Sequence, residues 1–249
     1  MPPRVRLPNQ YLPSRLFLIR HGESIANVDS SVYSHTPDWR IPLTDLGLTQ
    51  AEECGKDLKS IIGDQRVYFY GSPYMRAQQT LNKIAAHFDD NQVEGVREDA
   101  RLREQEMGNF QPVEDMKRVW GERSKQGRFF FRFPGGESGA DVCDRASSFM
   151  DSLFREREMA DDCAENVVIV FHGLMMRLFI ARWYKLPLEM FDAMYNPPNG
   201  KVLLMERDET MKKLILTKES QDLLGMKEVK DTALDGADMV DYYLNKLAK

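Results

Sequence analysis

Residues 16–22 read Leu-Phe-Leu-Ile-Arg-His-Gly, an apolar run that ends abruptly in two polar residues and a glycine. A short apolar run closed by a turn residue is typical of a strand buried in a parallel sheet. The pattern returns at residues 167–173, Val-Val-Ile-Val-Phe-His-Gly, and in a related form at residues 67–73, Val-Tyr-Phe-Tyr-Gly-Ser-Pro. We therefore expect three strands of one sheet, each of which ends in a turn.

Helical patterns lie between these strands. The alternation of strand and helix predicts an α/β fold, specifically a three-layer α/β/α sandwich with a mostly parallel central sheet. A weaker strand is expected at 93–96, and a late hairpin or edge pair at 201–206 and 213–217. Apolar residues recur at helical spacing in 51–62, 77–88, 142–153 and 174–179.

Two helix starts carry capping signals. Ser72 is expected to be an N-cap, with Pro73 at the first helical position. Ser138 and Asp141, three residues apart, form a capping pair that predicts the start of a second helix. These signals fix where two of the expected helices begin.

The chain is expected to form a single domain over residues 1–249. Its 249 residues suffice for one large α/β domain and are few for two. The stretch from about 109 to 134 fits the alternation poorly and is interpreted as an insertion. A charged tail follows from about residue 219, with a helix expected over 237–247.

The composition is that of an ordinary soluble protein. Hydrophobic residues make up 42% and charged residues 29%, with a net charge of -5, which disfavours a nucleic-acid partner. The three cysteines form no CxxC pair, so we expect a reducing compartment. No run approaches the ~20 apolar residues of a membrane helix, so we expect no membrane partner. We expect a cytoplasmic location, although the arginines of the N-terminus leave organelle import open, and a homodimer is compatible with the sequence.

Two histidines occupy equivalent positions at strand ends. Ligands in open α/β sheets bind beyond the carboxyl ends of the strands, so His21 and His172 are expected at the same edge. Each precedes a glycine, Gly22 or Gly173, which permits a tight turn and close approach of backbone to a ligand. On this motif alone, two unrelated histidines remain an equal alternative.

Arginines favour a phosphate site at this edge. Arg76 is expected in the first turn of the helix that follows the strand at 67–70, and Arg20 directly precedes His21. A guanidinium matches the geometry of phosphate oxygens, and a helix N-terminus adds backbone donors. Two arginines and two histidines together predict an anion pocket.

Five motifs in order resemble those of the histidine phosphatase superfamily, which includes the cofactor-dependent phosphoglycerate mutases. The resemblance runs from about residue 16 to 206 and is close to a eukaryotic branch called phosphoglycerate-mutase-like. The matching segments are residues 18–24 (LIRHGES), 72–80 (SPYMRAQQT), 102–108 (LREQEMG), 135–138 (GGES) and 171–173 (FHG).

The resemblance implies a role for each residue of the pocket. His21 is the expected nucleophile, which attacks phosphorus to form phosphohistidine. Arg20, Arg76 and His172 are expected to hold the oxygens of the transferring group. Further substrate-binding residues are expected within the motifs, namely Ser24, Asn27 and Gly173, although Asn27 is equally well interpreted as a helix or loop cap.

The family pattern favours Glu104 as the general acid. An alkoxide leaves poorly near neutral pH, so a proton donor is needed. Glu106 is the close competitor, because residues two apart on an extended segment point the same way. Without the resemblance, both carboxylates are better interpreted as solvated charges.

The loops add further candidates. Tyr33 and Thr36, after the catalytic turn, are candidates for lining the pocket. Residues 127–134, Gly-Arg-Phe-Phe-Phe-Arg-Phe-Pro, are either a cap in which Arg128 or Arg132 meets the substrate or an apolar packing segment. The second interpretation is favoured.

The sequence therefore predicts an enzyme that needs no metal and no other cofactor. The histidines lack metal-type spacing such as HExxH, and no GxxxxGK[ST] phosphate loop occurs. The function expected first is a phosphomonoesterase acting through phosphohistidine on a small phosphorylated metabolite. The second is a phosphoglycerate mutase, and the third is an inactive phosphate-binding scaffold.

Overall fold

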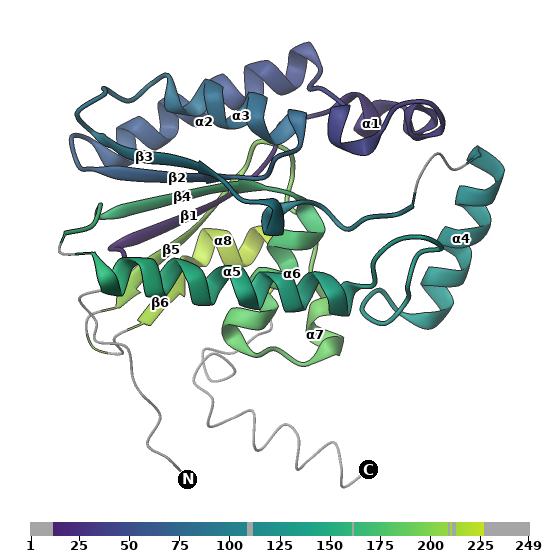
Figure 1. The fold of residues 1–249 in the computed structure, drawn as a ribbon. Helices are drawn as coiled ribbons and strands as arrows, with labels where there is room; N and C mark the ends of the chain where they lie inside the picture. The colour runs from purple at the N-terminus through teal and green to yellow at the C-terminus, as the bar shows by residue number, and fades with distance from the viewer. Residues whose placement is uncertain (1–11, 109–111, 161, 209, 211–212, 227–249) are drawn as a thin grey trace, which may run out of the picture.

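The computed structural model describes residues 12–108, 112–160, 162–208, 210 and 213–226. They form a six-stranded sheet in the order β3-β2-β4-β1-β5-β6, with helices on both faces (Figure 1). The first four strands in this order are parallel to one another, β5 is antiparallel to β1, and β6 is antiparallel to β5. The predicted α/β sandwich with a mostly parallel sheet is confirmed. The strands are β1 (Arg15–Arg20), β2 (Val67–Gly71), β3 (Val93–Glu98), β4 (Asn166–Phe171), β5 (Val202–Asp208) and β6 (Lys213–Leu216).

The register of β1 against β4 positions the two histidines. Arg20 pairs with Phe171, so both chains leave the sheet at the same level. The backbone N–H of His21 still donates to the Phe171 carbonyl at 3.0 Å. His21 and His172 therefore emerge side by side at one edge of the sheet, as the sequence predicts.

The alternation of buried side chains along β1 divides the core into two layers. Phe17 and Ile19 pack with the helices α2 (Asp45–Ile62) and α3 (Met75–Ala85) on one face. Leu16 and Leu18 pack on the opposite face with α5 (Gly139–Met159), α6 (Gly173–Tyr184) and α7 (Leu188–Ala193). Both faces are thus covered, which is why the central strands are apolar throughout. The remaining helices are α1 (Ile25–Val28), α4 (Val113–Gln126) and α8 (Lys218–Leu223).

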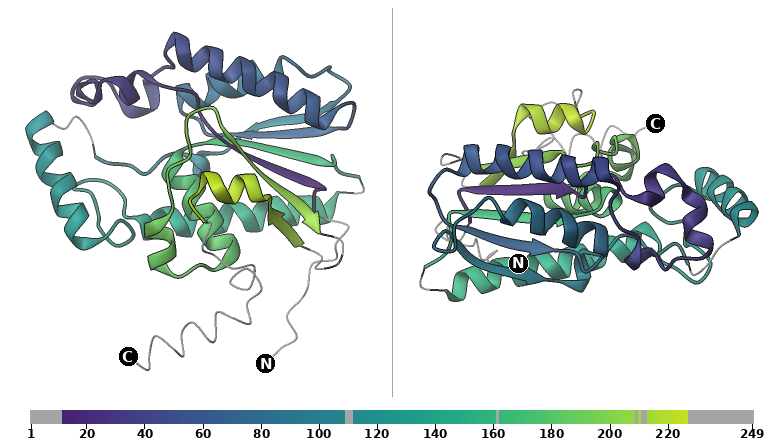
Figure 2. Two further views of the ribbon diagram at one scale, coloured as in Figure 1. Left: turned by 180° about the vertical axis from the view of Figure 1, so that it is seen from behind. Right: turned by 90° about the horizontal axis from the view of Figure 1, so that it is seen from above.

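Helix α4 stands apart from the sheet, beyond the edge where the histidines emerge (Figures 1 and 2). It belongs to the stretch interpreted from the sequence as an insertion. Val119 of α4 packs with Phe131 and Phe133 in a small separate core. The buried side chains of Phe131 and Phe133 show that packing is one role of the aromatic segment. Arg132 lies at the surface and pairs with Asp141 at 2.7 Å.

One predicted helix start is correct and the other is wrong. Ser138 caps α5, and its capping box with Asp141 is present. Ser72, in contrast, is not an N-cap, because α3 begins at Met75 with Tyr74 in the cap position. The Ser72 hydroxyl lies instead 2.8 Å from Nε2 of His172. The helix expected over 237–247 lies outside the described residues.

None of the helices in the described part of the chain has both the length and the apolar character needed to cross a bilayer.

Candidate functional site

The two ring nitrogens of His21 have different partners, one on the backbone and one on Arg76. Its Nδ1 lies 2.6 Å from the carbonyl oxygen of Gly22, and because a carbonyl only accepts, Nδ1 carries the proton. Nε2 keeps its lone pair and accepts a hydrogen bond from Nε of Arg76 at 3.3 Å. Burial, followed by the charge of Arg76, holds the pKa of His21 well below its ordinary value. The imidazole is therefore neutral at neutral pH, which is the nucleophilic form.

The turn after His21 requires glycine for steric reasons. A Cβ at Gly22 would lie 2.4 Å from the carbonyl oxygen of Gly47 at the start of α2. The backbone N–H of Gly22 donates to the Thr80 hydroxyl at 3.1 Å, which ties the turn to α3. The Asn199 amide donates to the carbonyls of His21 at 2.9 Å and Gly22 at 3.2 Å. These contacts from three segments fix the carbonyl that holds Nδ1 of His21.

His172 lies against His21, with their ring centroids 5.1 Å apart. Its Nε2 is bound to Ser72, and its buried Nδ1 has no hydrogen-bond partner among the described residues. Burial, then the charge of Arg76, keeps the pKa of His172 well below its ordinary value. A buried nitrogen without a partner is costly unless a ligand satisfies it, so Nδ1 is available to a bound oxyanion.

Arg76 is almost fully buried and is oriented by an unexpected partner. Its Nη1 donates to both the carbonyl and the carboxylate of Asp38 at 2.8 Å. Burial acts to lower the pKa of Arg76, but the charge of Asp38 and its hydrogen bond outweigh burial, and the pKa is raised. Asp38 thus keeps a positive charge stable beside His21.

Arg20 supplies a second, partly buried guanidinium. Its Nη1 donates to the Pro197 carbonyl at 2.7 Å, while its buried Nε has no hydrogen-bond partner among the described residues. Burial lowers the pKa of Arg20, and the nearby Glu104 opposes this effect. With Nδ1 of His172, the site therefore offers two unsatisfied buried nitrogens beside Nε2 of His21, an arrangement suited to an oxyanion.

Glu104 lies at the N-terminus of α6. Its two carboxylate oxygens accept the backbone N–H groups of Leu174 and Met175, each at 3.3 Å. The N–H of Gln105 donates to the same carboxylate at 2.9 Å. The helix N-terminus is a favourable place for a negative charge. The structure therefore brings the predicted acid to the helix that begins directly after His172.

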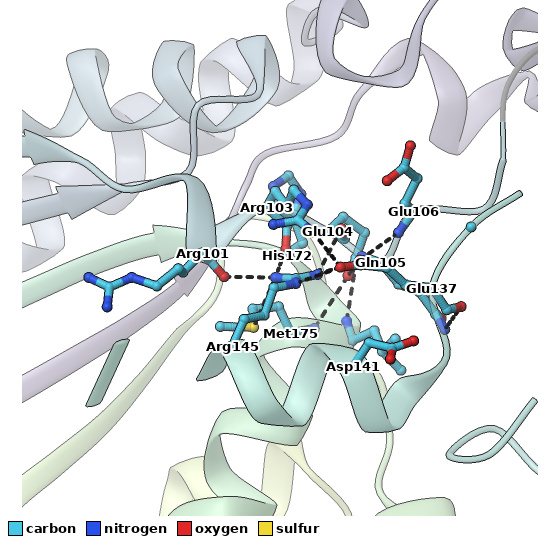
Figure 3. A network of polar contacts seen from close by, with 12 residues as sticks. Arg101, Arg103, Glu104, Gln105, Glu106, Glu137, Asp141, Arg145, His172 and Met175 are labelled. Atoms are coloured by element: carbon cyan, nitrogen blue, oxygen red, sulfur yellow. Dashed lines mark hydrogen bonds and ion pairs between the residues drawn. The ribbon is translucent and has the colours of Figure 1, made fainter. Parts of the chain in front are cut away.

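The segment that carries Glu104 is fixed by Arg145 of α5 (Figure 3). Arg145 donates to the carbonyl oxygens of Arg101 at 2.7 Å, Arg103 at 2.6 Å and Glu104 at 3.0 Å. It also forms a two-pronged ion pair with Glu137, with distances of 3.0 and 2.9 Å. Arg145 thus fixes the backbone on both sides of the predicted acid.

Glu106 points away from this network (Figure 3). It lines a cavity of about 400 Å³ with Tyr33, Thr36, Asp38 and Tyr74. The cavity adjoins the phosphate pocket, because Asp38 binds Arg76 and the Tyr74 ring lies 5.1 Å from the ring of His172. The two carboxylates that the sequence left as competitors therefore occupy different places. Tyr33 and Thr36 line the cavity, as proposed from their loop position.

The remaining predicted binding residues have mainly structural contacts. The Ser24 hydroxyl donates to Oδ1 of Asn27 at 3.0 Å, and the Ser24 N–H donates to the same atom at 3.0 Å. Asn27 is therefore engaged as a cap, the alternative that the sequence left open. A Cβ at Gly173 would lie 2.0 Å from Oδ1 of Asn196, so a larger residue there would displace the Asn196 side chain.

Sequence reasoning missed the partners that orient the site. Asp38, Arg145 and Asn199 act on residues far away in the chain, and no local motif marks them. Thr80 lies within the motif at 72–80, but the motif did not show that its hydroxyl binds the turn after His21. Glu137 belongs to the motif at 135–138, but the sequence did not predict its ion pair with Arg145. Among the described residues, no group of three or more His, Cys, Asp or Glu side chains is arranged to hold a metal ion.

Comparisons with known proteins agree with this geometry. A sequence profile of the histidine phosphatase superfamily (branch 1) matches residues 16–219. Phosphoglycerate mutase-like protein AT74 of Arabidopsis thaliana is 47% identical over 209 residues, which cover 80% of this chain and 66% of that protein. Broad-range acid phosphatase DET1 of Saccharomyces cerevisiae is 31% identical over an alignment of 299 residues, covering 82% of this chain and 88% of the yeast protein.

Solved structures agree as well. The mycobacterial glucosyl-3-phosphoglycerate phosphatase superposes with a TM-score of 0.65 and 25% identity, covering 82% of this chain and 97% of that one. The ordered motifs, the paired histidines at the sheet edge and these matches lead to one conclusion. The chain belongs to the histidine phosphatase superfamily of enzymes.

Proposed function

We propose that the protein is a metal-independent phosphomonoesterase that works through a phosphohistidine at His21. The observation that carries the proposal is the hydrogen bond from Nδ1 of His21 to the Gly22 carbonyl at 2.6 Å. It leaves the lone pair of Nε2 beside the Arg76 guanidinium. A neutral nucleophile next to buried cationic donors is what attack on a phosphate monoester requires.

The first half-reaction transfers the phosphoryl group to the enzyme. Nε2 of His21 attacks phosphorus, and the bond from phosphorus to the leaving oxygen breaks. Arg20, Arg76 and His172 hold the equatorial oxygens, where the charge of the transition state is spread. Glu104 donates a proton to the leaving oxygen, so that an alcohol departs rather than an alkoxide.

The second half-reaction returns the enzyme to its resting state. Glu104, now ionised, takes a proton from water, and the water oxygen attacks phosphorus. The bond from Nε2 to phosphorus breaks, and inorganic phosphate leaves. Splitting one displacement into two lowers each barrier, and the same three side chains, Arg20, Arg76 and His172, hold the phosphoryl oxygens in both transition states.

We favour hydrolysis over phosphoglycerate mutation because of Glu106. A mutase retains a substrate with two phosphates, and the carboxylate of Glu106 lines the cavity beside the phosphate pocket. Two unit charges of the same sign about 4 Å apart repel by roughly 4 kcal/mol near a protein surface. The Phe-x-Gly-Trp stretch of the mutases is also missing after the catalytic turn, where residues 30–43 read SSVYSHTPDWRIPL.

The test is a screen of small phosphorylated metabolites that measures free phosphate and isomerised product on the same samples. Enzyme primed with 2,3-bisphosphoglycerate should interconvert the two phosphoglycerates slowly or not at all, while it releases phosphate from at least one monoester. Mutase turnover many times faster than phosphate release on every ester would contradict the proposal. Phosphate binding with no turnover and no phosphoenzyme would favour the inactive scaffold.

A further inference from the structure

The lining of the cavity beside the phosphate pocket indicates which kind of leaving group the site accepts. Its volume of about 400 Å³ lies in the lower part of the roughly 300–1,000 Å³ range of small-molecule sites. Because Asp38 and Tyr74 contact Arg76 and His172, an ester bound at His21 has this cavity as its neighbour. The lining side chains that matter for recognition are Tyr33, Asp38, Trp39, Tyr74, Glu106 and Trp120.

The charges of the lining argue against a second anionic group. Asp38 and Glu106 are both carboxylates, and the described lining residues include no lysine, arginine or histidine. Asp38 is balanced by its ion pair with Arg76. Glu106 has no ion-pair partner among the described residues, so its field is directed at whatever enters the cavity.

The aromatic rings argue equally against a cation. The Arg40 guanidinium lies 4.5 Å from the centroid of Trp39, and that of Arg123 lies 4.9 Å from the centroid of Trp120. Arg76 lies 5.0 Å from the ring of Tyr74. A ring face that already carries a guanidinium has little attraction left for another cation.

What the lining offers is flat apolar surface. Trp39 and Trp120 are 49% and 39% exposed, although large aromatic residues are usually covered. The side chains of Met107 and Met116 add adaptable apolar contacts to the same cavity. A ligand that covers these rings removes apolar surface from water and needs no charge to bind.

We propose that this cavity is the leaving-group subsite and that it takes an uncharged organic group with an aromatic or other flat apolar face. The substrate class is then a phosphate monoester of a neutral alcohol, and hydrolysis releases that alcohol and inorganic phosphate. The inference rests on the proposed function for the orientation of the ester. It adds the chemical class of the part of the substrate that is not phosphate.

Binding of phosphonates tests the subsite without relying on turnover, because a phosphonate is not cleaved. Four probes share the anionic head: ethylphosphonate, benzylphosphonate, 4-carboxybenzylphosphonate and 4-(aminomethyl)benzylphosphonate. Calorimetry on the full chain should give benzylphosphonate a Kd about tenfold or more below those of the other three, since a buried ring contributes apolar area and a buried charge is penalised. Binding should also change tryptophan fluorescence.

Variants distinguish the loss of contacts in the cavity from a general loss of folding. Trp120→Ala should weaken the binding of benzylphosphonate much more than that of ethylphosphonate. Trp120→Phe should retain most of the difference in affinity between these two probes. Phe130→Ala is the matched control, because Phe130 is an exposed aromatic residue of the same insertion that does not line the cavity. It should leave the ratio of the two Kd values unchanged.

The outcomes distinguish this inference from the proposed function. Equal affinity for ethylphosphonate and benzylphosphonate would overturn the subsite, whatever the enzyme hydrolyses. Tighter binding of the carboxylated probe would overturn the exclusion of anions. Tighter binding of the amine would overturn the exclusion of cations. Turnover of benzyl phosphate without a phosphoenzyme would refute the proposed function and leave the subsite standing.

Discussion

Arg145→Lys should misplace the general acid, Glu104, while leaving the phosphate pocket in place. Arg145 donates five hydrogen bonds to oxygen, three to the backbone carbonyls of Arg101, Arg103 and Glu104 and two to the carboxylate of Glu137. Lysine keeps the charge, but one ammonium cannot reproduce the planar fork that spans these groups.

The size of the effect follows from the hydrogen bonds that lysine cannot make. An ammonium has three N–H donors for the five hydrogen bonds that Arg145 makes, so at least two bonds are lost. Hydrogen bonds to a charged group contribute about 1.5–3 kcal/mol each, so we expect the free energy of unfolding to fall by about 3–6 kcal/mol. A catalytic group misplaced by about 1 Å costs roughly 100-fold in rate. We therefore expect kcat for alkyl phosphates to fall about 10–100-fold, with a much smaller change in KM.

The assay is the single-turnover rate of enzyme phosphorylation with a matched alkyl and aryl phosphate. An aryl oxide leaves with little help, so its rate should fall far less than that of the alkyl ester. Arg101→Lys is the control, because Arg101 lies on the same segment and its side chain binds Asp99, Ser148 and Ser152 instead of Glu104. Equal losses for the two esters in Arg145→Lys would show that the residue is merely structural and would refute this reasoning.

Three further predictions follow from the site. Burial and the charge of Arg76 depress the pKa values of His21 and His172, so the folded protein binds fewer protons at these residues than the unfolded chain does. As the pH is lowered from 6.5, the free energy of unfolding should therefore decrease by about 1.4 kcal/mol per pH unit for each histidine. Denaturant titrations check this, and a slope in His172→Gln equal to that of the wild type would contradict it. Glu104→Gln should slow phosphorylation by alkyl esters more than by aryl esters, and a selective loss in Glu106→Gln alone would exchange the two assignments. Activity should survive EDTA and be blocked by vanadate, whereas loss in EDTA restored by zinc or magnesium would refute the metal-free mechanism.

The sequence predicts best those features that repeat along the chain. The runs before His21 and His172 are apolar because β1 and β4 are buried on both faces, so the strands, their shared edge and the pairing of the histidines follow from the pattern. The cap at Ser138 is a local contact between neighbours, and it too is correct.

Features set by contacts between distant segments are not predicted. Ser72 has the sequence of a cap, but its hydroxyl meets His172, 100 residues away in the chain. The period of two on an extended segment does not separate Glu104 from Glu106, because the contacts that separate them come from α6 and from the loop at Asp38. Arg145 and Asp38 act across the fold and leave no local signature.

The central claim is that His21 carries the phosphoryl group, and rapid-quench trapping tests it most directly. Wild-type enzyme mixed briefly with a radiolabelled phosphate ester should yield a labelled protein that is stable in base and loses its label in acid. His21→Ala should show no such label, while His87→Ala, which removes a histidine that pairs with Glu52 outside the site, should label like the wild type. A base-stable, acid-labile phosphoenzyme that persists in His21→Ala would contradict the account.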